Sequence, residues 1–169
     1  MSTPAALVVE DGTSKTNANT FITEAELIAF CDDRGLTYAS TDHGRVQNII
    51  QAADYLVAIE DKFQGERTST AQSLPFPRDG VKLYGSYIGA STIPQVLKDA
   101  QCYLAQLAYK NDLQPTGDGK EVIEEKVGSL GTKYAPSGSG RAKFDPAPAM
   151  AFLRKLFKWD AGMNIPILR

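Results

Sequence analysis

The sequence has little of what catalysis, metal binding and covalent cross-linking require. Its 169 residues include one histidine, two cysteines and one tryptophan. His43 alone cannot build a metal site of several histidines, and its place beside Asp42 predicts a polar surface side chain. Cys31 and Cys102 lie far apart in two predicted helices, without a C-x-x-C pair. We therefore expect buried thiols in a reducing compartment rather than a disulfide.

The chain also lacks a long hydrophobic run. No apolar stretch approaches the roughly 18 residues that a membrane span needs, and the start, Met-Ser-Thr-Pro, lacks the basic and apolar regions of a signal peptide. These absences predict a protein made in the cytoplasm with no membrane partner.

Strong charge of one sign is missing as well. A net charge of −2 argues against a protein whose main function is to bind the phosphate backbone of a nucleic acid along its surface. Residues 1–110 carry 9 basic and 13 acidic side chains (net −4), whereas residues 111–169 carry 9 and 7 (net +2). The basic carboxyl end is either a solvated helix face or a contact for an acidic partner or for DNA in passage.

Motifs for phosphate chemistry and catalysis are absent from the sequence. The glycines near Lys120 and Arg141 lack the G-x-x-x-x-G-K-[ST] spacing, and neither group lies between a strand and a helix. No nucleophile and base occur in a recognisable arrangement. We expect no enzyme, no cofactor and no metal site.

What is present is organised around residues 74–111. Apolar residues recur there at helical spacing and predict a central helix with a wide apolar face, opened by Pro94 in its first turn. The stripe comprises Ile93, Val96, Leu97, Ala100, Leu104, Leu107 and Ala108, broadened by Tyr103. Upstream, Pro75 and Pro77 hold Phe76 in an extended segment that is expected to lie across a core.

The remaining elements follow from periodicity and cap residues. Thr23 and Glu26 form a capping box for a helix that ends at Gly35, and a second helix spans residues 42–59 and should pack on the central one. Residues 7–9 favour an edge strand, 11–19 a loop or arm, and 121–135 a β-hairpin around residues 128–129. A last helix is expected to start with Asp145 as cap and Pro146 at its first position.

The sequence therefore predicts a mainly α fold, a small bundle of about four helices with a β-hairpin and extended terminal arms. We expect one domain over residues 1–169, with an amino-terminal arm (1–20), a helical core (21–144) and a carboxyl-terminal helix and docking tail (145–169). The core includes a long loop (61–90), expected to be pinned by its own aromatic side chains, and the hairpin (121–135).

Several segments, in this order, carry a family resemblance. They are residues 18–22 (ANTFI), 52–56 (AADYL), 74–81 (LPFPRDGV), 93–101 (IPQVLKDAQ) and 125–128 (EKVG), the last before a strand ending Lys133-Tyr134-Ala135. Together they resemble the head-tail adaptor (connector) proteins of tailed bacteriophages. Some members of that family are labelled DnaT-like single-stranded-DNA-binding proteins. The lead before Asn17 and the tail after Trp159 match no family pattern.

The resemblance implies a structural virion protein, made in the host cytoplasm and located at the head-tail interface. Such subunits form a homo-oligomeric ring, commonly twelve-fold, that docks on the portal protein, receives the tail or a stopper protein, and surrounds a channel for double-stranded DNA without reading its sequence. The portal-docking residues would be Trp159, Met163, Ile165, Ile167, Leu168 and Arg169. Glu124, Glu125, Lys126 and Lys133 would belong to a hairpin at the channel or between subunits.

The alternative is a replication-associated protein that binds single-stranded DNA. Such a protein needs aromatic side chains on which bases stack, set among basic residues. Tyr84 and Tyr87 lie close to Lys82 and Arg78 in the sequence, which supports this alternative. The overall acidity of the chain weighs against it.

Overall fold

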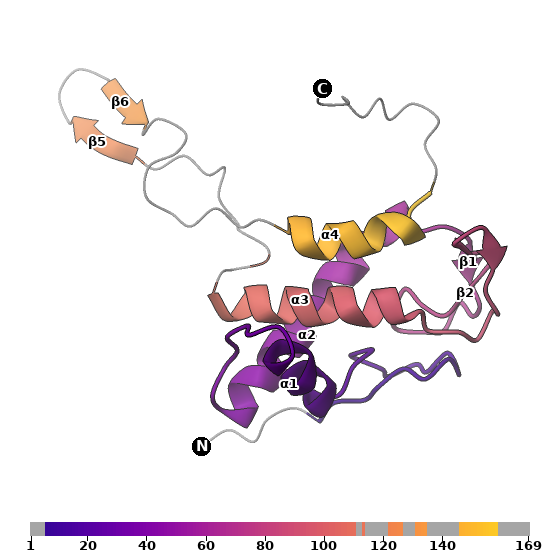
Figure 1. The fold of residues 1–169 in the computed structure, drawn as a ribbon. Helices are drawn as coiled ribbons and strands as arrows, with labels where there is room; N and C mark the ends of the chain where they lie inside the picture. The colour runs from indigo at the N-terminus through magenta and orange to yellow at the C-terminus, as the bar shows by residue number, and fades with distance from the viewer. Residues whose placement is uncertain (1–5, 111–112, 114–121, 127–130, 135–145, 159–169) are drawn as a thin grey trace, which may run out of the picture.

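Four helices form the body of the molecule in the computed structural model, which describes residues 6–110, 113, 122–126, 131–134 and 146–158. Helix α3 (Gln95–Lys110) lies at the centre and contacts α1 (Glu24–Asp32), α2 (Asp42–Ala58) and α4 (Ala147–Leu153) (Figure 1). The predicted mainly α fold, the central helix and its packing against the second helix are all confirmed.

The burial of α3 is wider than its apolar stripe. Val96, Leu97, Ala100 and Leu104 are buried as predicted, whereas Leu107 and Ala108 are half-buried. Because other helices contact α3 along several faces, burial extends to residues outside the stripe: Gln101, Cys102, Ala105 and Gln106. Burial raises the pKa of the Cys102 thiol to about 12, and both cysteines are free and buried, as the sequence predicts.

The first two helices each begin after a threonine that caps the free backbone amides of the first turn. The Thr23 hydroxyl accepts from the Glu26 amide at 3.1 Å, and the Glu26 carboxylate accepts from the Thr23 amide at 2.6 Å, so the predicted capping box is present. Thr41 caps α2 by accepting from the Gly44 amide at 3.1 Å. Helix α2 ends at Ala58 and runs into a short 3-10 turn, η1 (Glu60–Lys62).

Gln101 joins three segments inside the core. Its side-chain oxygen accepts from the Phe21 amide at 2.9 Å, and its side-chain nitrogen donates to the Thr20 hydroxyl at 3.0 Å and to the Ile49 carbonyl at 3.1 Å. The residue is fully buried. One side chain of α3 thus orients the chain entering α1 and fixes the position of α2.

We expect Gln101→Leu to lower the free energy of unfolding by about 2–3 kcal/mol, because the buried Phe21 amide loses its acceptor, and the Thr20 hydroxyl and the Ile49 carbonyl each lose a donor. Urea denaturation followed by circular dichroism measures the change. The control is Gln51→Leu, the same substitution at an exposed position of α2, which should change stability by less than about 0.5 kcal/mol. Equal effects of the two variants would contradict the role of Gln101.

The segment before α1 is a loop, as predicted, but not the expected edge strand. Residues 7–9 contribute only one isolated bridge, from Val9 to Thr20. The following loop folds around the buried Glu10 carboxylate, which accepts from the backbone amides of Gly12, Ser14 and Lys15 at 2.8, 3.0 and 2.7 Å. A carboxylate with three backbone donors gives this loop a defined shape.

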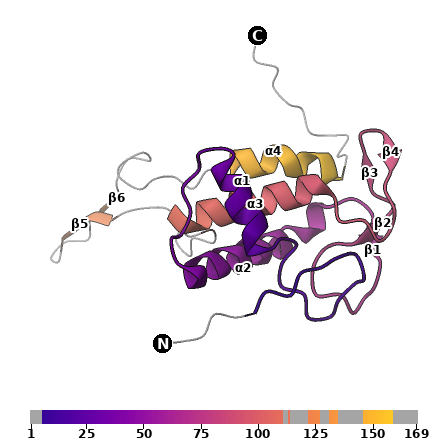
Figure 2. The same ribbon diagram turned by 60° about the horizontal axis from the view of Figure 1, so that its bottom comes forward.

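The link between α2 and α3 contains two small antiparallel hairpins that the sequence analysis missed. Strands β1 (Glu66–Arg67) and β2 (Arg78–Asp79) form one pair, and β3 (Lys82–Leu83) and β4 (Ser86–Tyr87) the other (Figure 2). Strands of two residues carry no detectable alternation, so periodicity could not find them. They lie at one end of the helical body, where α2 ends and α3 begins (Figure 2).

The last helix begins later than predicted. Pro146 is its N-cap rather than its first helical residue, and Asp145 lies outside the described residues. Helix α4 ends at Leu153 and continues as a 3-10 turn, η2 (Arg154–Leu156), before the chain becomes extended at Phe157. The reason is a bridge between Phe157 and Phe63, which requires an extended backbone there.

The predicted hairpin is present as β5 (Val122–Lys126) and β6 (Gly131–Tyr134), which pair antiparallel. Both views place this hairpin away from the helical body (Figures 1 and 2). Among the described elements, β5 and β6 contact each other and no helix or other strand.

Candidate functional site

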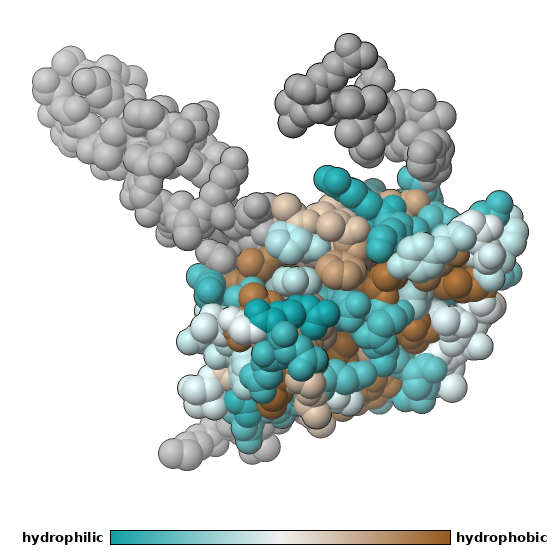
Figure 3. All heavy atoms as spheres, in the orientation of Figure 1, coloured by the Kyte–Doolittle hydropathy of each residue, from teal (hydrophilic) through white to brown (hydrophobic). Residues whose placement is uncertain are grey.

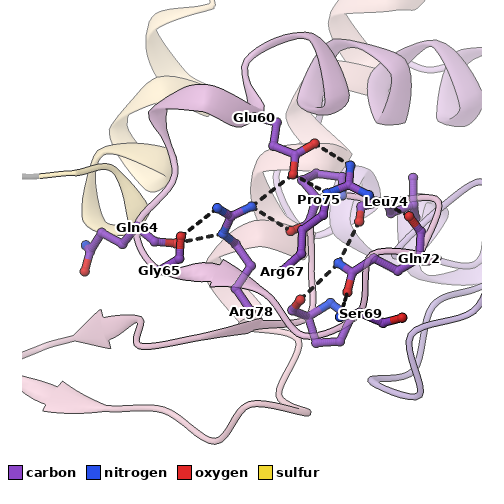
Figure 4. Close-up of polar contacts among 10 residues, drawn as sticks. Glu60, Gln64, Gly65, Arg67, Ser69, Gln72, Leu74, Pro75 and Arg78 are labelled. Carbon is purple, nitrogen blue, oxygen red and sulfur yellow. Dashed lines mark hydrogen bonds and ion pairs between the residues drawn. The ribbon is translucent and has the colours of Figure 1, made fainter.

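Two arginines and one carboxylate hold the link between α2 and α3 in place (Figure 4). Arg67 forms a two-point ion pair with Glu60. Arg78 donates to the same carboxylate at 3.1 Å and to the carbonyls of Gln64 and Gly65 at 2.8 and 2.7 Å. Because these residues come from η1, β1 and β2, the cluster ties the start of the link to its middle.

Gln72 and Phe76 complete the anchoring. The Gln72 side chain donates to the carbonyls of Leu74 and Pro77 at 2.9 and 3.0 Å and fixes the curve of the chain between the β-strands (Figure 4). Phe76 is fully buried and packs edge-on against Phe63, with 5.3 Å between the ring centroids. Phe63 and Phe76 pin the link to the core as predicted, whereas its other two aromatics, Tyr84 and Tyr87, are exposed and do not.

The cluster makes stability depend on pH. The hydrogen bond and charge of Arg67, together with Arg78, hold the pKa of Glu60 below its ordinary value of 4.5. The unfolded chain therefore binds a proton more readily than the folded one, so this stabilisation is present above about pH 4.5 and is lost as the pH falls through the lowered pKa.

We expect a Glu60→Gln variant to lose less stability than the wild type between about pH 4.5 and pH 3, because its amide does not titrate. Urea unfolding midpoints at several pH values measure this. Asp54→Asn on α2 is the control, since burial raises the Asp54 pKa and its contribution changes with pH in the opposite direction. Parallel curves for Glu60→Gln and wild type would contradict the role of Glu60.

The anchored link presents the β3–β4 hairpin to solvent. Tyr84 and Tyr87 are 75% and 70% exposed, the highest values among the large hydrophobic side chains of the described residues. The Lys82 ammonium lies 4.7 Å from the Tyr87 ring centroid. The Lys155 ammonium of η2 lies 5.2 Å from the Tyr84 ring centroid and donates to its hydroxyl at 3.2 Å. Each exposed ring thus has one lysine beside it.

Two further lysines continue this surface. The Lys158 amide donates to the Lys62 carbonyl at 2.8 Å, so the backbones of two exposed lysines from distant parts of the sequence lie side by side. Asp61, also exposed, is the neighbouring acidic residue in the chain. We call Lys62, Lys82, Tyr84, Tyr87, Lys155 and Lys158 the lysine–tyrosine patch. Figure 3 shows hydrophilic side chains beside the carboxyl end of α4, whereas α4 itself contains only apolar residues.

Within the part of the chain that the structure describes, the lysines of the patch have no ionic partner. None of the ion pairs among the described residues involves Lys62, Lys82, Lys155 or Lys158. Lysines without a carboxylate partner, next to exposed aromatic rings, are suited to bind an anionic partner that carries planar groups.

Comparison with known proteins places the chain in a family. A family model described as "Putative DnaT-like ssDNA binding protein" matches residues 5–169, nearly the whole chain. The chain belongs to this DnaT-like family. No curated protein and no solved structure matches the chain.

In this member of the DnaT-like family, the structure separates residues that the sequence analysis grouped. Arg78 was expected to support Tyr84 and Tyr87 at a DNA surface, and this expectation is wrong. The Arg78 side chain is only 8% exposed, and it donates hydrogen bonds to Glu60 and to three backbone carbonyls. The basic residue beside Tyr84 is instead Lys155, which is too far away in the sequence to have been predicted there.

The residues expected to dock on a portal lie outside the described part of the chain: Trp159, Met163, Ile165, Ile167, Leu168 and Arg169. The hairpin residues lie in β5 and β6, with Glu124 opposite Lys133 in the register and Glu125 opposite Thr132. Lys126 pairs with Gly131 at the end of the ladder.

His43 is half-buried rather than a surface residue, and its Nδ1 has no hydrogen-bond partner within the described residues. The described side chains contain no group of three or more histidine, cysteine or acidic residues that could hold a metal ion. None of the helices described here has the length and apolar composition to cross a membrane.

Proposed function

We propose that this DnaT-like protein is a head-tail connector: a subunit of a ring that docks on the portal of a bacteriophage head and provides the attachment platform and DNA channel for the tail. The β5–β6 hairpin carries the proposal. It contacts no other described element, and a two-stranded hairpin alone is marginally stable in water. A partner surface is therefore needed, and a neighbouring copy in a ring supplies one.

The compact body agrees with such a ring. A ring interface is heterologous, so one part of each subunit meets a different part of the next. The hairpin, which lies away from the helical body, provides the first part, and the body itself provides the second (Figure 1). The family resemblance of residues 74–101 supports the same role, as does the apolar tail after Trp159.

The proposed role is structural and needs neither catalysis nor a cofactor. The protein would be made in the host cytoplasm and incorporated at the head-tail interface of the virion. Its partners would be further copies of itself, commonly twelve, then the portal, and a tail or stopper protein. Double-stranded DNA would pass through the channel without sequence readout.

Co-sedimentation with tail-less heads that carry portal tests this function. We expect the full chain to sediment with the heads and to form rings visible by electron microscopy. A variant with residues 121–135 replaced by a short Gly/Ser segment should keep the body folded, because β5 and β6 contact no other described element, but should form no ring. A chain truncated after Phe157 separately tests portal docking by the tail.

The outcomes separate the parts of the proposal. Rings formed by the hairpin variant would remove the role of β5–β6, and heads bound by the truncated chain would remove the role of the tail. Failure of the full chain to bind heads that are competent for tail addition would overturn the connector function.

Binding of single-stranded DNA is the second candidate function, and the lysine–tyrosine patch together with the family description favours it. Its test is the salt dependence of oligonucleotide binding, because each phosphate contact on a single strand contributes about −0.7 to the slope of log K against log salt. A variant with Lys62→Gln and Lys158→Gln should flatten this slope by about 1.4. Absence of binding at low salt would remove this candidate.

A further inference from the structure

We propose that Tyr84 and Tyr87 form a stacking site for two bases of a single DNA strand, with the lysines of the patch contacting its phosphates. The inference rests on the second candidate function, single-stranded DNA binding, and adds the place and the mode of contact.

The turn of the β3–β4 hairpin places the first ring at its tip. Leu83 pairs with Ser86, which leaves Tyr84 and Gly85 as the two turn residues, with φ of 52° and 86°. Positive φ at both positions is typical of a tight hairpin turn in which asparagine and glycine are preferred. A tyrosine here adopts an unfavourable backbone conformation and buries little surface in return, since it is 75% exposed. The ring thus adds little to the body's packing.

The two rings are held by lysines rather than by a core. Lys155 contacts the Tyr84 ring and its hydroxyl, and Lys82 contacts the Tyr87 ring. An ammonium group on one side of an aromatic ring restricts its orientation and leaves the remaining exposed surface to another planar group. Bases stack on such rings whatever their sequence, because every base has a π face.

The arrangement of charge agrees with a strand passing over the rings. Lys82 and Lys155 lie beside the tyrosines, and Lys62 and Lys158 extend the positive surface from the same end of the body. These lysines have no carboxylate partner among the described residues, so a phosphate would not have to displace one. We expect binding without base preference, since stacking and phosphate contacts read no base edges.

The experiment is fluorescence anisotropy of a labelled oligothymidylate with the full chain at low salt. Replacing both rings (Tyr84→Ala with Tyr87→Ala) should weaken binding about 10- to 100-fold, whereas Tyr84→Phe with Tyr87→Phe should keep it, because stacking needs the ring and not the hydroxyl. Tyr109→Ala, at an exposed tyrosine near the end of α3, is the matched control and should leave affinity unchanged. Circular dichroism should show all three variants folded.

An abasic strand of equal length distinguishes stacking from charge, and we expect the wild-type chain to bind it about as weakly as the double alanine variant binds oligothymidylate. Equal binding of abasic and normal strands would overturn the stacking site. Wild-type binding that survives loss of both rings would overturn the site but leave the second candidate function intact. No wild-type binding would overturn both. Loss of head binding in the double alanine variant, without any oligonucleotide binding, would assign the patch to a protein partner instead.

Discussion

Replacing Arg78 with methionine is expected to lower the free energy of unfolding by about 3–5 kcal/mol. The guanidinium is nearly buried and donates to the Gln64, Gly65 and Pro75 carbonyls as well as to Glu60. Methionine fills a similar volume but donates nothing, so three carbonyls lose their donor in a place with little water. Chemical denaturation followed by circular dichroism measures the loss.

Arg67→Met is the matched control, because it removes the same group from the same carboxylate at a more exposed position. The Arg67 side chain is 30% exposed, so water can replace part of what it loses, and we expect about 1–2 kcal/mol. Since both arginines share Glu60, the double variant should not be additive. Arg67 also donates to the Gln72 carbonyl at 2.6 Å, so an Arg78→Met chain as stable as Arg67→Met would show that the three carbonyl bonds of Arg78 contribute no more than this single one.

Substituting alanine for Gly65 is expected to destabilise the protein by about 3 kcal/mol. Gly65 has a φ of +67°, and a Cβ there would lie 2.0 Å from the Asp79 carbonyl oxygen. The added methyl group would therefore force apart the backbone next to the β1–β2 pair. Thermal and chemical unfolding both measure the change.

Gly35→Ala separates the two causes. Gly35 has a φ of +61° but nothing within 4 Å of the added Cβ, so only the backbone conformation is penalised, by about 1 kcal/mol. The difference between the variants isolates the steric contact at Asp79. Equal decreases in the free energy of unfolding for Gly35→Ala and Gly65→Ala would mean that the link accommodates the methyl group without a steric penalty.

Periodicity and cap residues predicted the helices because each signal is local. The Thr23 capping box, the stripe of α3 and the second helix all depend on residues within a few positions of one another. The burial of Gln101 was not predicted, because it is a polar residue that does not belong to the apolar stripe. It becomes a core residue through its hydrogen bonds to Thr20 and Ile49, which lie in other segments. No pattern in a single sequence indicates such partners.

The candidate site was predicted in part for the same reason. Tyr84, Tyr87 and Lys82 are close in sequence and were found together, whereas Lys155 is 71 positions from Tyr84 and could not be connected with it. Arg78 was misassigned because proximity in sequence says nothing about which side of a two-residue strand faces inward. Its buried carbonyl partners decide its role.

The contact between the start of the link and the segment that follows α4 closes a very long loop of chain. Lys62 and Gln64 bond to Lys158 and Leu156, so nearly the whole second half of the protein has to be synthesised before this contact can form. Such distant pairing slows folding. It also makes the intervening segment easy to alter, since doubling the length of a closed loop costs only about 0.6 kcal/mol. The chain between α3 and α4 can therefore lengthen or shorten during evolution, changing the reach of the β5–β6 hairpin while the helical body keeps its fold.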